Sequence, residues 1–548
     1  MLPEPTLPPP VSRLLLAGAV FIASLCTLVI ELVAGRIMAP YVGVSLYTWT
    51  SIIGVVLAGI SIGAYLGGRL ADRFPDRSLL GWLYLASGLA ALAIGPLVDL
   101  LGPTTASDWL GAHASLMTSV LLLTAAGFFV PALLLGTVSP VVVKLAIRGL
   151  ADAGSVVGRL YALSTIGSLV GTFATGFFLI SWLGTRRILL IVGLVLIAGA
   201  PLFGGWLGRR RGSRAAIVAL LLALVPLALA LRADRARSGR HGRPASGVPA
   251  GDIYFTAESN YYTIRLARFT RADLGGEVQA LYIDHLAHSF NDRGDPSFLL
   301  YDYLKVFERA VRLRSATGDS LRLLFVGGGG YTLPRLIEQR YPRTLIDVVE
   351  IDPMVTRVAR DFMGLPTRTR IRTLNEDARW FMIGEASRAG RYDLIFADAF
   401  SDLSIPYHLT TREFAAQLRG RLAPGGLVLA NVIDSWRDGA FMPSYLRTLE
   451  TVFGKGQVGL VGPRIAFEHA ERGQSTFVIL ASDRPLDAGA LLRPGSRPED
   501  DLDMRAVGAG DLARYLRDRE GIVLTDDHAP VDNLIAPLFA ERFASARR

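Results

Sequence analysis

Cysteine is almost missing from this 548-residue chain, and charged residues are few. The single cysteine, Cys26, excludes a disulfide framework and a cysteine-rich zinc site. Charged residues make up 19% of the chain and hydrophobic residues 51%, a balance that excludes an intrinsically disordered protein. Only three of the 57 basic residues are lysines, which reflects genome composition more than function. The length alone would accommodate about three or four average domains.

The formal net charge of +9 is unevenly distributed along the chain. Residues 1–235 carry +8, whereas the remainder carries only +1. The apolar residues are concentrated in the same first part, so a lipid bilayer explains the basic excess better than a nucleic acid does. We therefore expect a membrane partner and no nucleic-acid partner.

Long apolar runs recur through the first 231 residues. A helix that crosses a bilayer needs about 20 largely apolar residues, and a cleaved signal peptide would not be followed by so many further runs. Soluble core helices are a poor alternative for so many nearly uncharged segments. We predict a multi-pass transmembrane domain over residues 1–231, with seven candidate spans near 13–35, 46–69, 79–101, 115–147, 157–183, 187–206 and 215–231.

Two features of this domain go beyond hydropathy. Glu31 lies inside the first span, where a carboxylate is costly, so it has either a functional role or a structural pairing with Arg36. The loop at residues 67–77 resembles the short charged motif of major facilitator transporters, although a proline replaces its late glycine. Transport therefore stays open as a hypothesis.

Arginines and one lysine cluster at residues 69–77, 144–159 and 209–214. The positive-inside rule places these loops and the N-terminus in the cytoplasm, and seven full spans would then put the rest of the chain outside. The segment 215–231 is short, contains Pro226 and is flanked by arginines, so it can also lie in the interface or re-enter. We prefer that interpretation, which keeps the C-terminal part in the cytoplasm.

The C-terminal part has the pattern of an α/β enzyme. Residues 232–250 lack any apolar period and are predicted to be a linker, and residues 251–320 to form a small β-hairpin subdomain with a connecting helix. From residue 321 to 548, strand-like and helix-like segments alternate, which predicts a parallel sheet flanked by helices. The predicted fold class is a multi-span α-helical membrane domain followed by a Rossmann-like, methyltransferase-type domain.

Functional groups follow the predicted strands in order. A glycine run at residues 327–330 follows the first strand, Glu350 follows the second, Asp377 the third and Asp398 the fourth. Ligands of such sheets bind beyond the carboxyl ends of the strands, where a carboxylate can accept hydrogen bonds from ribose or adenine. The alternative is that these acids only cap helices. The glycines lack the third glycine of the dinucleotide fingerprint, so a nucleoside ligand fits better.

At these residues the chain resembles the spermidine synthase family of polyamine aminopropyltransferases, which have an S-adenosylmethionine-type Rossmann fold. The combination with a multi-span domain is similar to membrane-fused members. The resemblance implies cofactor-binding roles for Gly327, Gly328, Gly329, Glu350, Asp377 and Ala378, with Asp398 as the catalytic base. It also implies decarboxylated S-adenosylmethionine as co-substrate, with no permanently bound cofactor. No metal is expected, because no third ligand is apparent beside His285 and His288. The matching segments are residues 326–329, 349–352, 376–378, 392–398 and 422–426.

The departures from the family pattern fall on the amine side of the site. Gly330 stands where the family usually has an aspartate, and Tyr262 where it has a glutamine. Candidate substrate contacts are therefore Tyr262, Asp302, Asp402 and His408. A polyamine is the expected substrate and a homo-oligomer is compatible with the sequence. An S-adenosylmethionine-dependent methyltransferase and a polyamine transporter or sensor that binds nucleosides without turnover remain the alternatives.

Overall fold

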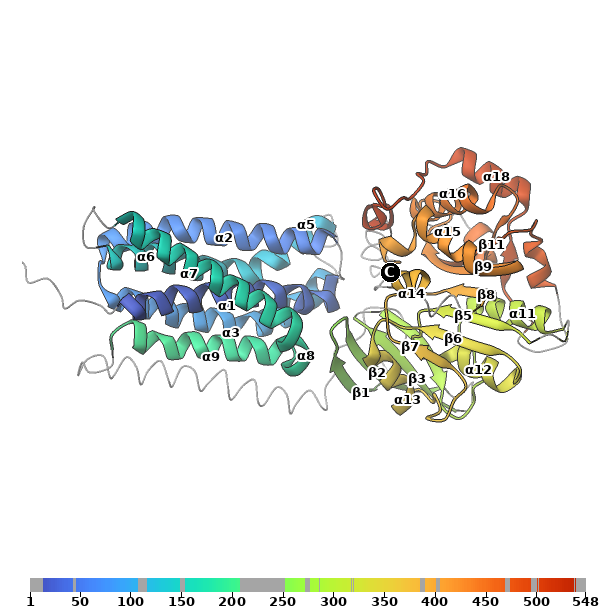
Figure 1. Ribbon diagram of the computed structural model, residues 1–548, viewed down its shortest axis with the longest axis horizontal. Helices are drawn as coiled ribbons and strands as arrows, with labels where there is room; N and C mark the ends of the chain where they lie inside the picture. Colours follow the sequence, from blue (N-terminus) through green and yellow to red (C-terminus); the bar gives the residue numbers. More distant parts are fainter. Residues whose placement is uncertain are drawn as a thin grey trace, which may run out of the picture. The chain divides into compact units, whose positions relative to one another are not determined.

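A computed structural model gives the architecture of the chain, which divides into two compact units (Figure 1). One unit comprises Met1–Gly242 with Glu258–Asn260, and the other Arg243–Ala257 with Tyr261–Arg548. The structure describes residues 13–42, 46–106, 116–147, 153–206, 252–271, 276–284, 286–316, 318, 320–384, 390–400, 405–468, 474–493, 500, 502–536 and 538.

The first unit is helical, as expected. Six of its segments are long and apolar enough to cross a membrane, and they coincide with the first six predicted spans. The seventh predicted span, 215–231, lies outside the described residues. The elements are α1 (Arg13–Val42), α2 (Leu46–Arg73), α3 (Arg77–Ala106), α5 (Leu116–Thr124), η1 (Ala125–Phe129), α6 (Val130–Ala146), α7 (Ala153–Ala174), η2 (Thr175–Leu179), α8 (Ile180–Leu183) and α9 (Thr185–Phe203).

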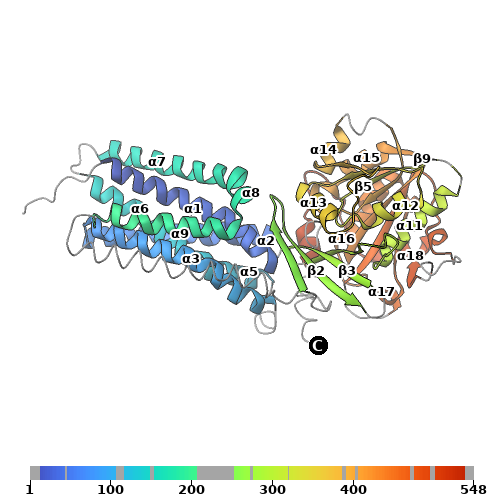
Figure 2. The ribbon, with the colours of Figure 1, turned by 90° about the horizontal axis from the view of Figure 1, so that it is seen from below.

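Glycines allow these helices to pack closely. Helix α1 lies along α7 (Figure 2). Likewise α2 lies along α6 and α3 along α9. A Cβ atom added at Gly63 of α2 would collide with the carbonyl oxygen of Leu133 on α6. The hydroxyls of Ser24 and Ser164 meet at 2.6 Å between α1 and α7. Small residues and interhelical hydrogen bonds of this kind hold helices together where no hydrophobic effect drives them. Glu31 lies half-buried on α1.

The second unit begins with a four-stranded sheet in sequential order, followed by a helix. Its middle strands pair in antiparallel fashion, which matches the alternating pattern of apolar and polar residues in this segment. The strands are β1 (Asp252–Glu258), β2 (Thr263–Arg271), β3 (Gly276–Ile283) and β4 (Leu286–Asp292), and the helix is α11 (Asp302–Ser315).

An eight-stranded sheet forms the rest of this unit, in the order β12-β10-β11-β9-β8-β5-β6-β7. The five strands from β9 to β7 are parallel, whereas β11 runs antiparallel to β9 and β10. The strands are β5 (Arg322–Val326), β6 (Leu345–Val349), β7 (Arg372–Leu374), β8 (Tyr392–Ala397), β9 (Leu422–Asp434), β10 (Val458–Pro463), β11 (Ser475–Ser482) and β12 (Met504–Ala506).

Helices cover both faces of this sheet (Figure 1). They are α12 (Thr332–Arg340), α13 (Pro353–Asp361), α14 (Ala378–Ile383), α15 (Arg412–Arg421), α16 (Phe441–Phe453), α17 (Arg464–Glu468) and α18 (Ala509–Asp518), with short turns η4 (Tyr407–Leu409) and η5 (Ala488–Leu492). Because both faces are covered, the central strands are almost continuously apolar. The predicted fold class is therefore confirmed.

The helix after the glycine run is preceded by a residue in the left-handed region. The N-cap position of α12 belongs to Tyr331, whose φ is +54°. Thr332 is the first helical residue, and its hydroxyl donates to the side chain of Asn291. The left-handed residue lets the chain turn from the glycine run directly into α12.

Candidate active site

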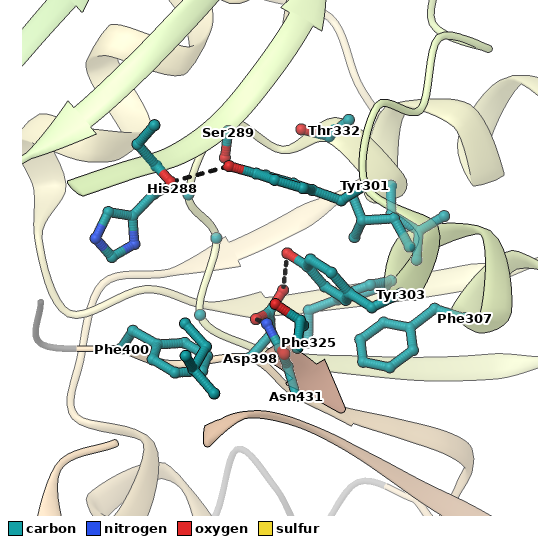
Figure 3. Close-up of a pocket in the computed structure, with 18 of the residues that line it drawn as sticks. His288, Ser289, Tyr301, Tyr303, Phe307, Phe325, Thr332, Asp398, Phe400 and Asn431 are labelled. Carbon is teal, nitrogen blue, oxygen red and sulfur yellow. Dashed lines mark hydrogen bonds between the residues drawn. The ribbon is translucent and has the colours of Figure 1, made fainter. Parts of the chain in front are cut away.

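A cavity of about 230 Å³ opens at the carboxyl ends of β5, β8 and β9 (Figure 3). Its wall combines the glycine run after β5, residues 286–289 of β4, the start of α11 and the ends of β8 and β9. Parallel sheets of this kind bind their ligands beyond the carboxyl ends of the strands. The structure thus brings Gly327, Gly328, Gly329 and Asp398 into one site.

Two residues of the glycine run have no space for a side chain. Gly327 has a φ of +100°, and a Cβ atom there would lie 2.5 Å from the backbone oxygen of Asp398. Gly330 is enclosed as well, because a Cβ atom would lie 2.7 Å from the Cβ of Ser289. The Gly330 N–H donates to the Ser289 hydroxyl at 2.9 Å. There is accordingly no room at residue 330 for the carboxylate that the resemblance leads one to expect.

Glu350 supports the glycine run from the side of β6. One carboxylate oxygen accepts the N–H groups of Gly328 and Gly329, at 2.8 and 3.4 Å. The other accepts the Asp352 N–H at 2.9 Å. Burial raises the pKa of Glu350, and these backbone donors oppose the increase. Its proposed contact with ribose remains a prediction.

Among the described residues that line the cavity, Asp398 is the one with a carboxylate side chain. Its Oδ2 accepts the Tyr303 hydroxyl at 3.1 Å and its Oδ1 accepts the Asn431 amide at 2.8 Å (Figure 3). Burial raises the pKa of Asp398 to about 6, although the two hydrogen bonds lower it. A carboxylate with such a pKa can accept a proton near neutral pH.

Aromatic rings form much of the wall around Asp398. The rings of Tyr301 and Tyr303 lie 5.7 Å apart, and Tyr303 meets Phe307 edge to face at 5.5 Å. The Tyr301 hydroxyl donates to the backbone oxygen of Ala287 at 3.1 Å and so is directed away from Asp398. Aromatic faces attract cations, which suits an amine ligand.

Asp377 and His408 form a second cluster, and neither residue lines the cavity as far as the structure describes it. One oxygen of Asp377 caps α14 by accepting the N–H groups of Arg379 and Trp380, at 2.9 and 3.0 Å. The other lies 2.9 Å from Nε2 of His408. Burial alone would raise the pKa of Asp377, but these contacts lower it overall. Ala378 is the buried first residue of α14. The helix-cap interpretation therefore holds for one oxygen of Asp377.

Two further candidate residues lie outside the described wall of the cavity. Asp302 forms an ion pair with Lys305 at 2.6 Å on α11, and Tyr262 is half-buried between β1 and β2. Neither contributes to the wall of the cavity as far as the structure describes it. Asp402 lies outside the described residues. Within the described ranges, no three His, Cys, Asp or Glu side chains gather in a way that could hold a metal ion.

Sequence reasoning missed Tyr303 and Asn431 as neighbours of Asp398. The signal for Asn431 was available, because it is the polar residue in the apolar run of β9. Tyr303 gave no such signal, since its contact with Asp398 joins α11 to β8 across 95 residues of sequence.

Comparison with known proteins gives relatives over most of the chain. A curated protein from Streptomyces coelicolor named polyamine aminopropyltransferase 2 is 27% identical over 550 aligned residues, covering 92% of this chain and 92% of that protein. Over most of its length the chain is therefore similar to proteins named polyamine aminopropyltransferase. A polyamine aminopropyltransferase from Vibrio vulnificus is 33% identical over 114 residues, which span 21% of this chain and 38% of the Vibrio protein.

Among solved structures, a probable spermidine synthase from Corynebacterium glutamicum is 21% identical to this chain, with a TM-score of 0.40. The superposition covers 49% of this chain and 94% of that one. No family model matches the sequence.

Proposed function

We propose that this protein is a membrane-anchored aminopropyltransferase of the spermidine synthase type. The observation that carries the proposal is the placement of Asp398, which lies buried in a cavity at the carboxyl ends of parallel strands, beside a glycine run. The names of the relatives aligned over most of the chain support the same assignment over the methyltransferase and transporter alternatives.

The reaction is a transfer of an aminopropyl group from decarboxylated S-adenosylmethionine to a polyamine or diamine. The lone pair of an acceptor amine attacks the aminopropyl carbon next to the sulfonium, a new C–N bond forms, and the C–S bond breaks. Its electrons return to sulfur, so methylthioadenosine leaves. The acceptor nitrogen loses one proton, which Asp398 receives. No permanently bound cofactor takes part.

The glycine run and the acids that follow β6 and β7 are assigned to the nucleoside. Gly327, Gly328 and Gly329 let the nucleoside approach the backbone, and Glu350 beside them is assigned to ribose. Asp377 and Ala378 are assigned to adenine. The aromatic wall next to Asp398 suits the cationic acceptor.

Four residues are assigned to the amine substrate, chiefly from their positions in the sequence. His408 is joined to Asp377 and follows Asp398 along the chain, so it is assigned to the substrate side of the nucleoside site. Asp402 is assigned to the acceptor from its sequence position alone. Tyr262 and Asp302 keep the same assignment, which requires them to act beyond the cavity wall described above.

The test is a product analysis with the purified full-length protein. It is incubated with decarboxylated S-adenosylmethionine or with S-adenosylmethionine, each with a diamine. Methylthioadenosine from the decarboxylated donor supports the proposal. S-adenosylhomocysteine from the ordinary donor would instead indicate a methyltransferase, and neither product from a folded protein that binds nucleosides would refute both enzyme assignments.

The six apolar helices are assigned to the cell membrane. S-adenosylmethionine compounds are cytoplasmic metabolites, so the catalytic unit is placed in the cytoplasm. The bilayer and the polyamine are the proposed partners, self-association is compatible with this assignment, and no nucleic acid is required.

A further inference from the structure

Two hydrogen-bond donors converge on the carboxylate of Asp398 from different elements. Tyr303 reaches Oδ2 from the first turn of α11, at 3.1 Å, and Asn431 reaches Oδ1 from β9, at 2.8 Å. Both side chains line the cavity, and both residues are at least nine-tenths buried. The contacts therefore lie where bulk water cannot easily replace them.

The orientation of Asn431 follows from its neighbour. A carboxylate can only accept hydrogen bonds, so the amide nitrogen and not the amide oxygen faces Asp398. Tyr303 likewise donates, because an ionised carboxylate has no proton to give and the hydrogen bond must use the proton of the Tyr303 hydroxyl. Each carboxylate oxygen of Asp398 thus accepts one hydrogen bond from the protein, and its second lone pair can accept a hydrogen bond from a ligand.

The packing of Tyr303 fixes where its hydroxyl lies. Its ring is held between Tyr301 at 5.7 Å and Phe307 at 5.5 Å. The hydroxyl is consequently a preformed donor, whose alignment does not have to be established when the substrate binds.

We propose that Tyr303 is a positioning residue for Asp398, which orients the carboxylate and keeps it ionised so that it can take the proton of the acceptor amine. Asn431 does the same from the opposite oxygen. This inference rests on the proposed function, because it assigns the proton to Asp398. It adds two residues to which the family resemblance assigned no role.

The other titratable groups of the cavity wall do not supply the same contact. Tyr301, the neighbour of Tyr303 on the segment that leads into α11, donates to the Ala287 carbonyl. His288 of β4 also lines the cavity, whereas the two hydrogen bonds described for Asp398 come from Tyr303 and Asn431. Tyr301 therefore offers a matched control, since Tyr301→Phe removes an equivalent hydroxyl from the same wall but leaves the donors of Asp398 in place.

The experiment compares the pH dependence of kcat for the wild type, Tyr303→Phe and Tyr301→Phe, all as full-length proteins. Loss of the Tyr303 donor favours the protonated carboxyl, so the acid limb of Tyr303→Phe should move up by about one pH unit. The limb of Tyr301→Phe should stay at the wild-type position, whatever its rate. Asn431→Ala should move the limb in the same direction as Tyr303→Phe.

An unchanged acid limb in Tyr303→Phe, with an active wild type, would overturn this inference and leave the proposed function standing. If the wild type forms no methylthioadenosine, the proposed function fails instead. The titration of Asp398 can still be followed without turnover, as the infrared difference between wild type and Asp398→Asn. A higher midpoint in the Tyr303→Phe background would support the positioning role, and an identical midpoint would overturn it.

Discussion

Asp398 combines two properties at the scale of a single residue. Burial makes its ionisation costly, whereas Tyr303 and Asn431 stabilise the ionised form. A base for a protonated amine needs this compromise, because a carboxylate that is too acidic would not retain the proton. In the proposed reaction, the position of Asp398 at the end of β8, against the glycine run, would bring the carboxylate close to the bound nucleoside.

Replacing Asp398 by Asn should reduce kcat by about 100-fold or more, because the proton acceptor is lost. The affinity for methylthioadenosine should change little, since the glycine run and Glu350 are untouched. Steady-state kinetics and calorimetric titration measure the two effects. Turnover that survives the substitution would show that another group is the base.

The activity of the wild type should fall on the acid side of about pH 6, the value to which burial raises the pKa of Asp398. The sign follows from the role of the residue, because only the ionised carboxylate can accept a proton. Below that pH, kcat should decrease about tenfold per pH unit. A profile that stays flat down to pH 5 would contradict the assignment.

The sequence allowed us to predict the positions of residues that directly follow strands. It did not allow us to predict contacts between residues that are far apart in the chain. Gly327 and Asp398 could be placed together because parallel strands end at one edge. The contact between His408 and Asp377 depends on how the chain returns from β8 to α15, and no local pattern encodes it. For the same reason the sequence did not reveal that Tyr262 is not among the described residues that line the cavity.

At the scale of elements, the glycine run and β4 form one rigid corner of the site. Ser289 and Asn291 of β4 hold Gly330 through its N–H and its carbonyl. This explains why the aspartate of the resembling family is absent here, since β4 occupies its space.

Gly330→Asp should therefore destabilise the protein by about 1–3 kcal/mol and should not increase turnover, because the added side chain collides with Ser289. Gly420→Ala is the matched control. It lies exposed on α15 with nothing within 4 Å of the added atom, so stability should stay the same or rise slightly. Denaturant titration compares the two, and a Gly330→Asp variant as stable as the control would refute the packing argument.

In the helical unit, the contact between α2 and α6 depends on glycine. Gly63→Ala should lower the unfolding temperature in detergent, at a cost of about 1–3 kcal/mol, because the methyl group meets the Leu133 carbonyl. Gly68→Ala on the same helix meets nothing within 4 Å and should leave the temperature unchanged. Equal effects of the two substitutions would argue against this packing.

Element types were predictable where the periodicity was strong. Six apolar helices and the strands β5 to β9 could be assigned from hydropathy and from the spacing of glycine and acid. The antiparallel extension by β10, β11 and β12 was not predicted, because short apolar runs do not reveal their pairing partners.

At the scale of the whole molecule, the proposal places the catalytic unit in the cytoplasm. The single cysteine of the chain is buried in α1, so an introduced exposed cysteine would be the reactive thiol. Ala513→Cys on α18 should resist a membrane-impermeant maleimide in intact cells and react after permeabilisation. The wild type is the control, and labelling of Ala513→Cys in intact cells would place the unit outside.

We propose that this two-unit protein transfers an aminopropyl group. The most direct measurement uses decarboxylated S-adenosylmethionine that carries an isotope label in its aminopropyl carbons, with the full-length protein and a diamine. We expect the label to appear in a longer polyamine, with one methylthioadenosine released per labelled product. Unlabelled amine, together with an intact donor and a folded protein, would contradict it.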